Sequence, residues 1–250
     1  MCYPTLPIVK ILPGYRGAII STKPNSRLLI QVINLARRPD RLAKIEGELQ
    51  RAGLSFEVQT AVDGKLDRLG SKYLSDGEVG CWKSHVNSMR RQVETKHPFS
   101  LILEDDAIIR SPVDENFLRK MMDLMERNKI DMLQIGYIEH FYSASLRRGI
   151  FEFLIALLKG RGVKDSSGFR FVPGEFRAGT HAYLVGNRLA KAISETVPEP
   201  PLIPWDGYLE SLARGQVGRG DINISRLVKS LVPQFSRAHE GMRLDSDVTP

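Results

Sequence analysis

Short apolar runs rich in β-branched residues alternate with longer segments of helical periodicity along most of the chain. The helix predicted at 78–96 is a clear example, because Val79, Trp82, Val86 and Met89 form one apolar stripe. Strands alternating with helices predict an α/β fold, with a mostly parallel central sheet flanked by helices on both faces. Strands are predicted at 27–33, 55–59, 100–103, 131–135 and 181–185, and further helices at 39–51, 117–127 and 208–213.

Three consecutive carboxylates, Glu104, Asp105 and Asp106, directly follow the third predicted strand. Adjacent acids repel one another, so either solvent or a cation must relieve them. One interpretation is a solvated turn between strands. The other is a Mg²⁺ or Mn²⁺ site, because ligands of open α/β sheets bind beyond the carboxyl ends of the strands and these ions prefer oxygen ligands.

Composition and charge bound the class of protein. A chain of 250 residues with 42% hydrophobic residues can bury the core of one α/β domain. The net charge of +7 favours polyanionic partners, which are nucleic acid, an anionic membrane surface or phosphorylated substrates. Two cysteines, Cys2 and Cys81, make no disulfide framework, so a cytoplasmic protein is expected.

The predicted organisation is a loose N-terminal extension at 1–26 followed by a single domain at 27–250. The extension lacks the order of a secretory signal. Within the domain, the segment 140–170 is predicted to be variable, and it joins an apolar stretch to basic flanks. Such a segment could contact an anionic membrane surface peripherally, at the inner face of the cytoplasmic membrane, or it could be a buried helix.

Several short motifs occur in a fixed order. Together they resemble glycosyltransferase family 25, the bacterial lipooligosaccharide transferases and their collagen-modifying relatives, over about residues 27–235. The resemblance implies a GT-A fold, which is a nucleotide-binding α/β domain with an acidic metal motif that transfers a sugar with inversion. The motifs are INLARRPDR (33–41), AVDG (61–64), LSDGEVGCWKSH (74–85), LILEDD (101–106), GTHAYLV (179–185), PWDGYL (204–209) and, faintly, Pro233-Gln234.

The resemblance also implies the reaction. A hexose, galactose or glucose, would move from a UDP-sugar donor to a glycolipid or oligosaccharide acceptor, in bacterial lipopolysaccharide or lipooligosaccharide biosynthesis. Glu104 and Asp106 would hold Mn²⁺ or Mg²⁺ on the donor diphosphate, and Asp105 would contact the donor.

Donor-binding candidates follow the first two predicted strands. Asn34, Arg38 and Arg41 surround the start of the first helix, where guanidinium groups and the helix N-terminus suit phosphate oxygens. A solvated basic helix face is the alternative for the two arginines. Asp63 could accept hydrogen bonds from the ribose or the base, although Asp-Gly is also an ordinary turn.

Two histidines and a glutamate are further candidates. Glu78 and His85 lie seven residues apart on one predicted helix, and either could act in catalysis. A purely structural histidine is the alternative. His181 could face the acceptor or merely close a turn. Cys81 is interpreted as core packing.

Asp206 follows a proline-rich loop and opens a predicted helix. Inversion requires a base that removes the proton of the acceptor hydroxyl, and the family's acidic motif matches Asp206. We therefore assign it as the catalytic base or acceptor anchor, with a helix N-cap as the alternative.

Two other functions stay open at this point. A nucleotidyltransferase would share the sheet, the metal acids and the nucleotide, but it would release pyrophosphate where the transferase releases UDP. A non-catalytic basic binding module would bind RNA or an anionic membrane. The sequence carries no recognised nucleic-acid-binding motif, so nucleic acid is not the expected partner.

Overall fold

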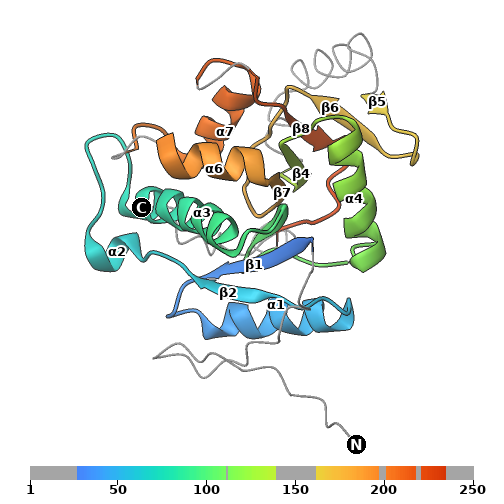
Figure 1. Cartoon of the computed structure of the whole chain (residues 1–250). Coiled ribbons are helices and arrows are strands. Elements are labelled where there is room, and N and C mark those ends of the chain that lie inside the picture. Colours follow the sequence, from blue (N-terminus) through green and yellow to red (C-terminus); the bar gives the residue numbers. More distant parts are fainter. Residues whose placement is uncertain (1–26, 111, 139–161, 197–200, 218–220, 235–250) are drawn as a thin grey trace, which may run out of the picture.

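The computed structural model describes residues 27–110, 112–138, 162–196, 201–217 and 221–234 (Figure 1). The predicted extension at 1–26 and the apolar stretch of the predicted variable segment lie outside these residues. The membrane contact of that stretch therefore stays a prediction.

A mixed sheet of eight strands forms the centre of the described part of the molecule (Figure 1). The strand order across the sheet is β2-β1-β3-β7-β4-β8-β6-β5. The strands are β1 (Leu28–Asn34), β2 (Glu57–Thr60), β3 (Phe99–Glu104), β4 (Met132–Gly136), β5 (Val163–Lys164), β6 (Arg170–Pro173), β7 (Ala182–Gly186) and β8 (Ile224–Leu227).

The prediction of a mostly parallel sheet is wrong. The pairs β1–β2, β1–β3 and β4–β8 are parallel, whereas β3–β7, β4–β7, β5–β6 and β6–β8 are antiparallel. Strand β7 enters between β3 and β4 and runs opposite to both. A strand buried on both faces reads as a continuous apolar run whichever way it points, so the sequence pattern carried no information about its direction.

The helices begin and end where the sequence supplies capping signals. Helix α1 has Pro39 at its first position, and α3 begins with a capping box between Ser75 and Glu78. None of the helices in the described ranges combines the length and apolar character that crossing a bilayer needs. They are α1 (Pro39–Arg51), α2 (Gly64–Asp67), α3 (Asp76–Thr95), α4 (Glu115–Arg127), α6 (Asn187–Thr196) and α7 (Trp205–Ala213).

The helices cover both faces of the sheet and give it two cores. On β3, Leu101 and Leu103 pack with α1 and α4, while Ile102 points to the opposite face and packs with α3, α6 and α7. Successive side chains of a strand point to opposite faces, so each central strand contributes to both cores. This double burial explains why the central strands are apolar throughout.

The register of the strands brings several strand ends to one edge. Ile33 of β1 is level with Gln59 of β2 and with Glu104 of β3. Because β7 is antiparallel, its first residue, Ala182, lies level with Leu103. The loops after β1, β2 and β3 and the residues before β7 therefore meet at the same place.

Candidate functional site

An open pocket lies at this edge, between the loops that follow the three parallel strands and the first half of α3. It combines basic, acidic and thiol side chains with a small apolar floor. The lining residues are Ile33, Leu35, Arg37, Arg41, Ala61, Val62, Asp63, Gly64, Lys65, Gly77, Cys81, Ser84, His85, Glu104, Asp105, Asp106 and Gln234.

The acidic triplet is buried, which excludes the solvated turn. Asp105 and Asp106 are 7% and 9% exposed, and the Glu104 side chain is 24% exposed. The three carboxylates turn to different partners. The hydrogen bonds and charges of these protein groups therefore relieve part of the mutual repulsion of the three carboxylates.

Glu104 is held from two sides. Its Oε1 atom lies 3.3 Å from Nε2 of His85 and accepts a hydrogen bond from the Thr180 hydroxyl. Burial disfavours the charged carboxylate, but the hydrogen bond and charge of His85 and the Thr180 hydroxyl outweigh it, so the pKa of Glu104 is lowered. Glu104 is thus an oriented carboxylate.

Asp105 is tied to the end of β1 and the start of α1. Its Oδ2 atom accepts a 2.7 Å hydrogen bond from Nδ2 of Asn34, and Arg41 lies 3.3 Å from Oδ1. Burial raises the pKa of Asp105 despite both partners. Asn34 is itself 1% exposed, so it positions Asp105 and does not line the pocket.

Asp106 is the least compensated acid of the triplet. Its Oδ2 atom accepts a 2.7 Å hydrogen bond from Gln234, while its buried Oδ1 atom has no hydrogen-bond partner among the described residues. Burial, followed by the charges of Glu104 and Asp105, raises the pKa of Asp106 to about 7. The site therefore favours either a proton or a cation at this oxygen.

Asp106→Asn is expected to stabilise the metal-free protein increasingly as pH rises. The folded pKa lies above the unfolded value, so wild-type Asp106 keeps its proton on folding between about pH 4 and 7 and loses stability across that window. The variant does not titrate there. Its free energy of unfolding should exceed that of wild type by on the order of a few kcal/mol above pH 7, and the gap should close near pH 4, as measured by denaturant titrations in EDTA. A pH-independent difference would contradict this assignment.

Asp63 begins α2 at the rim of the pocket. It caps α2 by accepting from the Leu66 amide at 3.2 Å, and Nε of Arg37 donates to it at 2.7 Å. Burial opposes ionisation, but these partners lower the pKa of Asp63. Asp63 is thus the N-cap of α2 and also lines the pocket, and its contact with the ribose or the base stays a prediction.

Two glycines hold α2 against α3. A Cβ atom at Gly64 would lie 1.7 Å from the carbonyl oxygen of Asp76, and one at Gly80 would lie 2.6 Å from that of Val62. Only glycine permits this approach of two backbones. The contact sets the wall of the pocket on which Asp63 and Lys65 lie.

Of the two predicted phosphate-binding arginines, the structure brings only Arg41 into the pocket lining. Arg38 pairs with Asp40 at 2.9 Å, and its carbonyl accepts from Asn34. Arg37, which the sequence reasoning passed over, lines the pocket instead. Three arginines within five residues made the choice between them unreadable from spacing.

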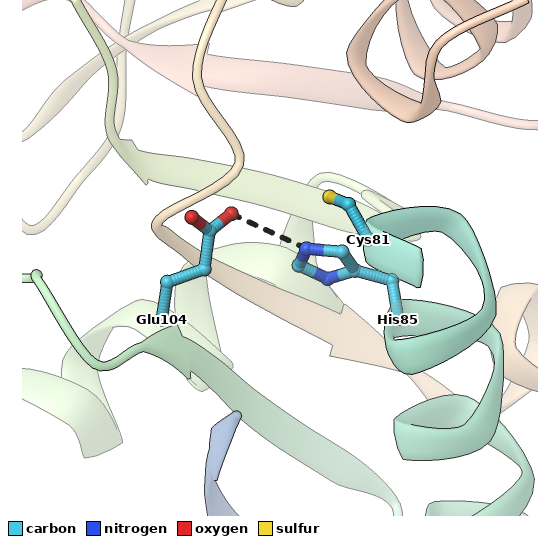
Figure 2. Close-up of side chains that lie close together, drawn as sticks. All are labelled: Cys81, His85 and Glu104. Atoms are coloured by element: carbon cyan, nitrogen blue, oxygen red, sulfur yellow. Dashed lines mark hydrogen bonds and ion pairs between the residues drawn. The ribbon is translucent and has the colours of Figure 1, made fainter. Parts of the chain in front are cut away.

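His85 and Cys81 both line the pocket from α3, one turn apart (Figure 2). Nδ1 of His85 is hydrogen-bonded to the Tyr183 hydroxyl at 2.8 Å, and the ring stacks on Trp205. Cys81 packs against the core, as predicted, but it also reaches the pocket. Burial, together with the Glu104 and Asp206 carboxylates, raises the pKa of its thiol well above the usual value. The sequence signal that could have placed Cys81 at the pocket is its spacing of four residues, about one helical turn, from His85.

Two predicted residues have structural positions away from the pocket lining. Glu78 completes the capping box, accepting from the Ser75 amide and hydroxyl at 2.8 Å each. His181 is fully buried, and its Nε2 donates to the Val232 carbonyl at 2.7 Å. Neither side chain is among the residues that line the pocket, so the catalytic role of Glu78 and the acceptor contact of His181 stay predictions.

Asp206 lies in the first turn of α7 but is not its N-cap, so the capping alternative is wrong. Pro204 occupies the cap position, and the Asp206 side chain accepts only from the adjacent Gly207 amide, at 2.9 Å, among the contacts recorded for it. It does not line the pocket, although it is near enough to influence the Cys81 thiol. Trp205, which precedes it, stacks on His85.

Two partners of the triplet come from far along the chain. Thr180 reaches Glu104 from the loop before β7, and Gln234 reaches Asp106 from beyond β8. Both lie within motifs recognised in the sequence, GTHAYLV and Pro233-Gln234, but neither residue was assigned a role. Only the fold shows what they contact.

Comparisons with known proteins agree with the motifs. The family model described as glycosyltransferase family 25 (LPS biosynthesis protein) matches residues 28–209. A glycosyltransferase 25 family member from Aedes aegypti is 28% identical over 198 residues, covering 72% of this chain and 30% of that protein. Procollagen galactosyltransferase 2 of Mus musculus is 29% identical over 126 residues, which cover 43% of this chain and 19% of that protein.

Further matches widen the range of activity among the relatives. An inactive glycosyltransferase 25 family member 3 of Mus musculus is 33% identical over 113 residues, covering 38% of this chain and 18% of that protein. A crystal structure of a protein from STIV matches over 83% of each chain at 13% identity. Its TM-score of 0.39 is too low to carry an argument. The chain spans less than a third of the length of each of these curated relatives. The family model nevertheless covers well over half of the chain, and the chain belongs to glycosyltransferase family 25.

Proposed function

We propose that the protein is a metal-dependent, inverting glycosyltransferase with a GT-A-type fold that moves a hexose from a UDP-sugar to a saccharide acceptor. Family membership supports the reaction class, and the pocket supports the donor class. The observation that carries the proposal is a buried oxygen on Asp106 that has no hydrogen-bond partner among the described residues, next to two further carboxylates at the end of β3.

The residues of the pocket fit a divalent cation. The Oδ1 atom of Asp106 lacks a hydrogen-bond partner among the described residues, and carboxylate oxygen is the ligand that Mn²⁺ and Mg²⁺ prefer. Asp106 would hold the ion, with Glu104 contributing through water or to the ribose. When bound, the cation would supply charge stabilisation for the departing UDP.

The basic and polar residues of the pocket suit the rest of a nucleotide. Arg41 lines the pocket beside Asp105, and guanidinium forks bind phosphate oxygens in pairs. Lys65 also lines the pocket. Asp63, kept ionised by its partners, would accept hydrogen bonds from ribose hydroxyls or from the base.

The sugar and the acceptor are less constrained. Galactose is supported by relatives named procollagen galactosyltransferases, and a bacterial glycolipid by the description of the family as LPS biosynthesis proteins. We favour galactose on a lipooligosaccharide-type acceptor, made at the inner face of the cytoplasmic membrane. Asp206 is proposed as the base that receives the acceptor proton.

A thermal-shift panel tests the donor proposal directly. UDP-galactose, UDP-glucose and UDP are each added with Mn²⁺, with EDTA and with neither. At about 100 times Kd, a ligand stabilises the native state by about 2.7 kcal/mol, which for a chain of this size raises Tm by roughly 5–10 °C. We expect such a shift only with donor and Mn²⁺ together.

The products separate the remaining alternatives. Release of UDP in the presence of an acceptor supports the transferase, whereas pyrophosphate release from a nucleoside triphosphate would assign a nucleotidyltransferase. Donor binding without turnover on any saccharide would match the inactive relative. Salt-sensitive RNA binding without a donor shift would favour the basic binding module.

A further inference from the structure

Three side chains of different chemistry converge on one wall of the pocket (Figure 2). One ligand atom each from Cys81, His85 and Glu104 lies within 4.8 Å of the other two. The geometry points to a binding site for one thiophilic divalent transition-metal ion of the Zn²⁺ class, with these three residues as its ligands. The site shares Glu104 with the oxygen site proposed at Asp106 but differs from it in its thiol and imidazole ligands, and it does not depend on transferase activity.

The spacing of the histidine and carboxylate ligand atoms fits a tetrahedral ion. Two N or O ligands at about 2.0–2.1 Å from Zn²⁺ are separated by roughly 3.3 Å in a tetrahedron. The distance between Nε2 of His85 and Oε1 of Glu104 is 3.3 Å. Cys81 completes the set one helical turn before His85, so that α3 supplies two ligands from the same face.

The surrounding contacts orient the ligands as metal sites require. With Nε2 directed at the metal, Nδ1–H of His85 would donate to the Tyr183 hydroxyl, which lies 2.8 Å away. Metal-bound histidines usually donate their second N–H in this way. The Thr180 hydroxyl fixes the Glu104 carboxylate, and Trp205 stacks on the imidazole. The ring and the carboxylate are thus oriented before an ion arrives.

The donor set selects the type of ion. A thiolate, a neutral imidazole and a carboxylate together carry two negative charges, which balance one divalent ion, and the thiol releases its proton on binding. Thiolate is a soft ligand that suits Zn²⁺ and is a poor ligand for Mg²⁺ or Mn²⁺. Three protein ligands leave the fourth tetrahedral position facing the pocket, as in zinc sites that bind water or substrate.

Cobalt substitution tests the inference on the full-length chain. Co²⁺ is titrated into reduced, metal-free protein while thiolate-to-cobalt charge-transfer absorption and visible bands are recorded, and Zn²⁺ is then added. We expect one equivalent of Co²⁺ to produce both signals and one equivalent of Zn²⁺ to abolish them. Absence of a charge-transfer band in the wild-type protein would overturn the proposal.

Matched variants identify the ligands, because the chain has just one other cysteine, Cys2. Cys81→Ser should remove the charge-transfer band and weaken Zn²⁺ binding by at least about 100-fold, more than the loss of an outer-shell partner. Cys2→Ser should behave as wild type. His85→Gln should weaken binding similarly and His97→Gln should not, with circular dichroism verifying the fold of each. A band that survives in Cys81→Ser but disappears in Cys2→Ser would refute the site.

Failure here and failure of the proposed function give different results. A missing cobalt signal with an intact Mn²⁺-dependent donor shift would remove the thiophilic site and leave the transferase proposal standing. A cobalt signal without any donor shift would support the thiophilic site and remove the transferase proposal.

Discussion

Asp106→Asn is expected to reduce sugar transfer by roughly 100-fold or more while the metal-free protein stays folded. The substitution keeps the size of the side chain and removes the charge that would hold the cation. A metal ion supplies several kcal/mol of charge stabilisation at a departing diphosphate, and each 1.36 kcal/mol corresponds to a tenfold change in rate. UDP release measured with saturating donor and acceptor gives the turnover.

The metal link adds a second readout to the same variant. EDTA should stop transfer by the wild-type protein, and added Mn²⁺ should restore it. Asp123→Asn is the matched control, since it removes the same charge from α4, where Asp123 pairs with Arg27 far from the pocket lining. Full, EDTA-insensitive transfer by Asp106→Asn would exclude a cation at this acid.

Local signals in the sequence were sufficient for most of the first half of the fold. The predicted and observed bounds of α1 agree, because Pro39 can begin a helix and Gly53 adopts the positive φ that follows its end. Strands β1 and β3 were found as apolar runs within one or two residues of their ends. Here burial and chain propensity point to the same structure.

In the second half of the chain, β4, β7 and α7 were predicted to within a few residues, whereas β5, β6, β8 and α6 were missed. Helix α6 was overlooked although Leu189, Ala190 and Ile193 give it a readable apolar face. Strand β8 includes Arg226, which is 7% exposed and pairs with Glu175 at 2.8 Å. A buried charge that depends on a partner 51 residues away cannot be recognised from the apolar pattern of its own segment.

The candidate site divides in the same way. The position of Glu104 to Asp106 at the pocket followed from the rule that ligands bind beyond strand ends, together with one apolar run. The contacts of the triplet could not follow, because Gln234 lies 128 residues from Asp106 in the chain. Cys81 was readable in part: its distance of one helical turn from His85 placed both on one face, but nothing local showed that this face borders a pocket.

Asp206→Asn is the second substitution with a large expected effect, and it separates chemistry from binding. Asp206 lies in the first turn of α7 and is not the cap of that helix. The amide of asparagine can still accept the hydrogen bond from the Gly207 backbone. We therefore expect near-normal stability and an unchanged Mn²⁺-dependent donor shift.

Turnover of this variant should nevertheless fall by about 100-fold or more, the usual scale for loss of a general base. Glu210→Gln is the control, because Glu210 lies one turn later on α7 and forms an ion pair with Arg214. Turnover near that of wild type would show that Asp206 is not the base. The candidates for the base would then be the carboxylates and the imidazole that line the pocket.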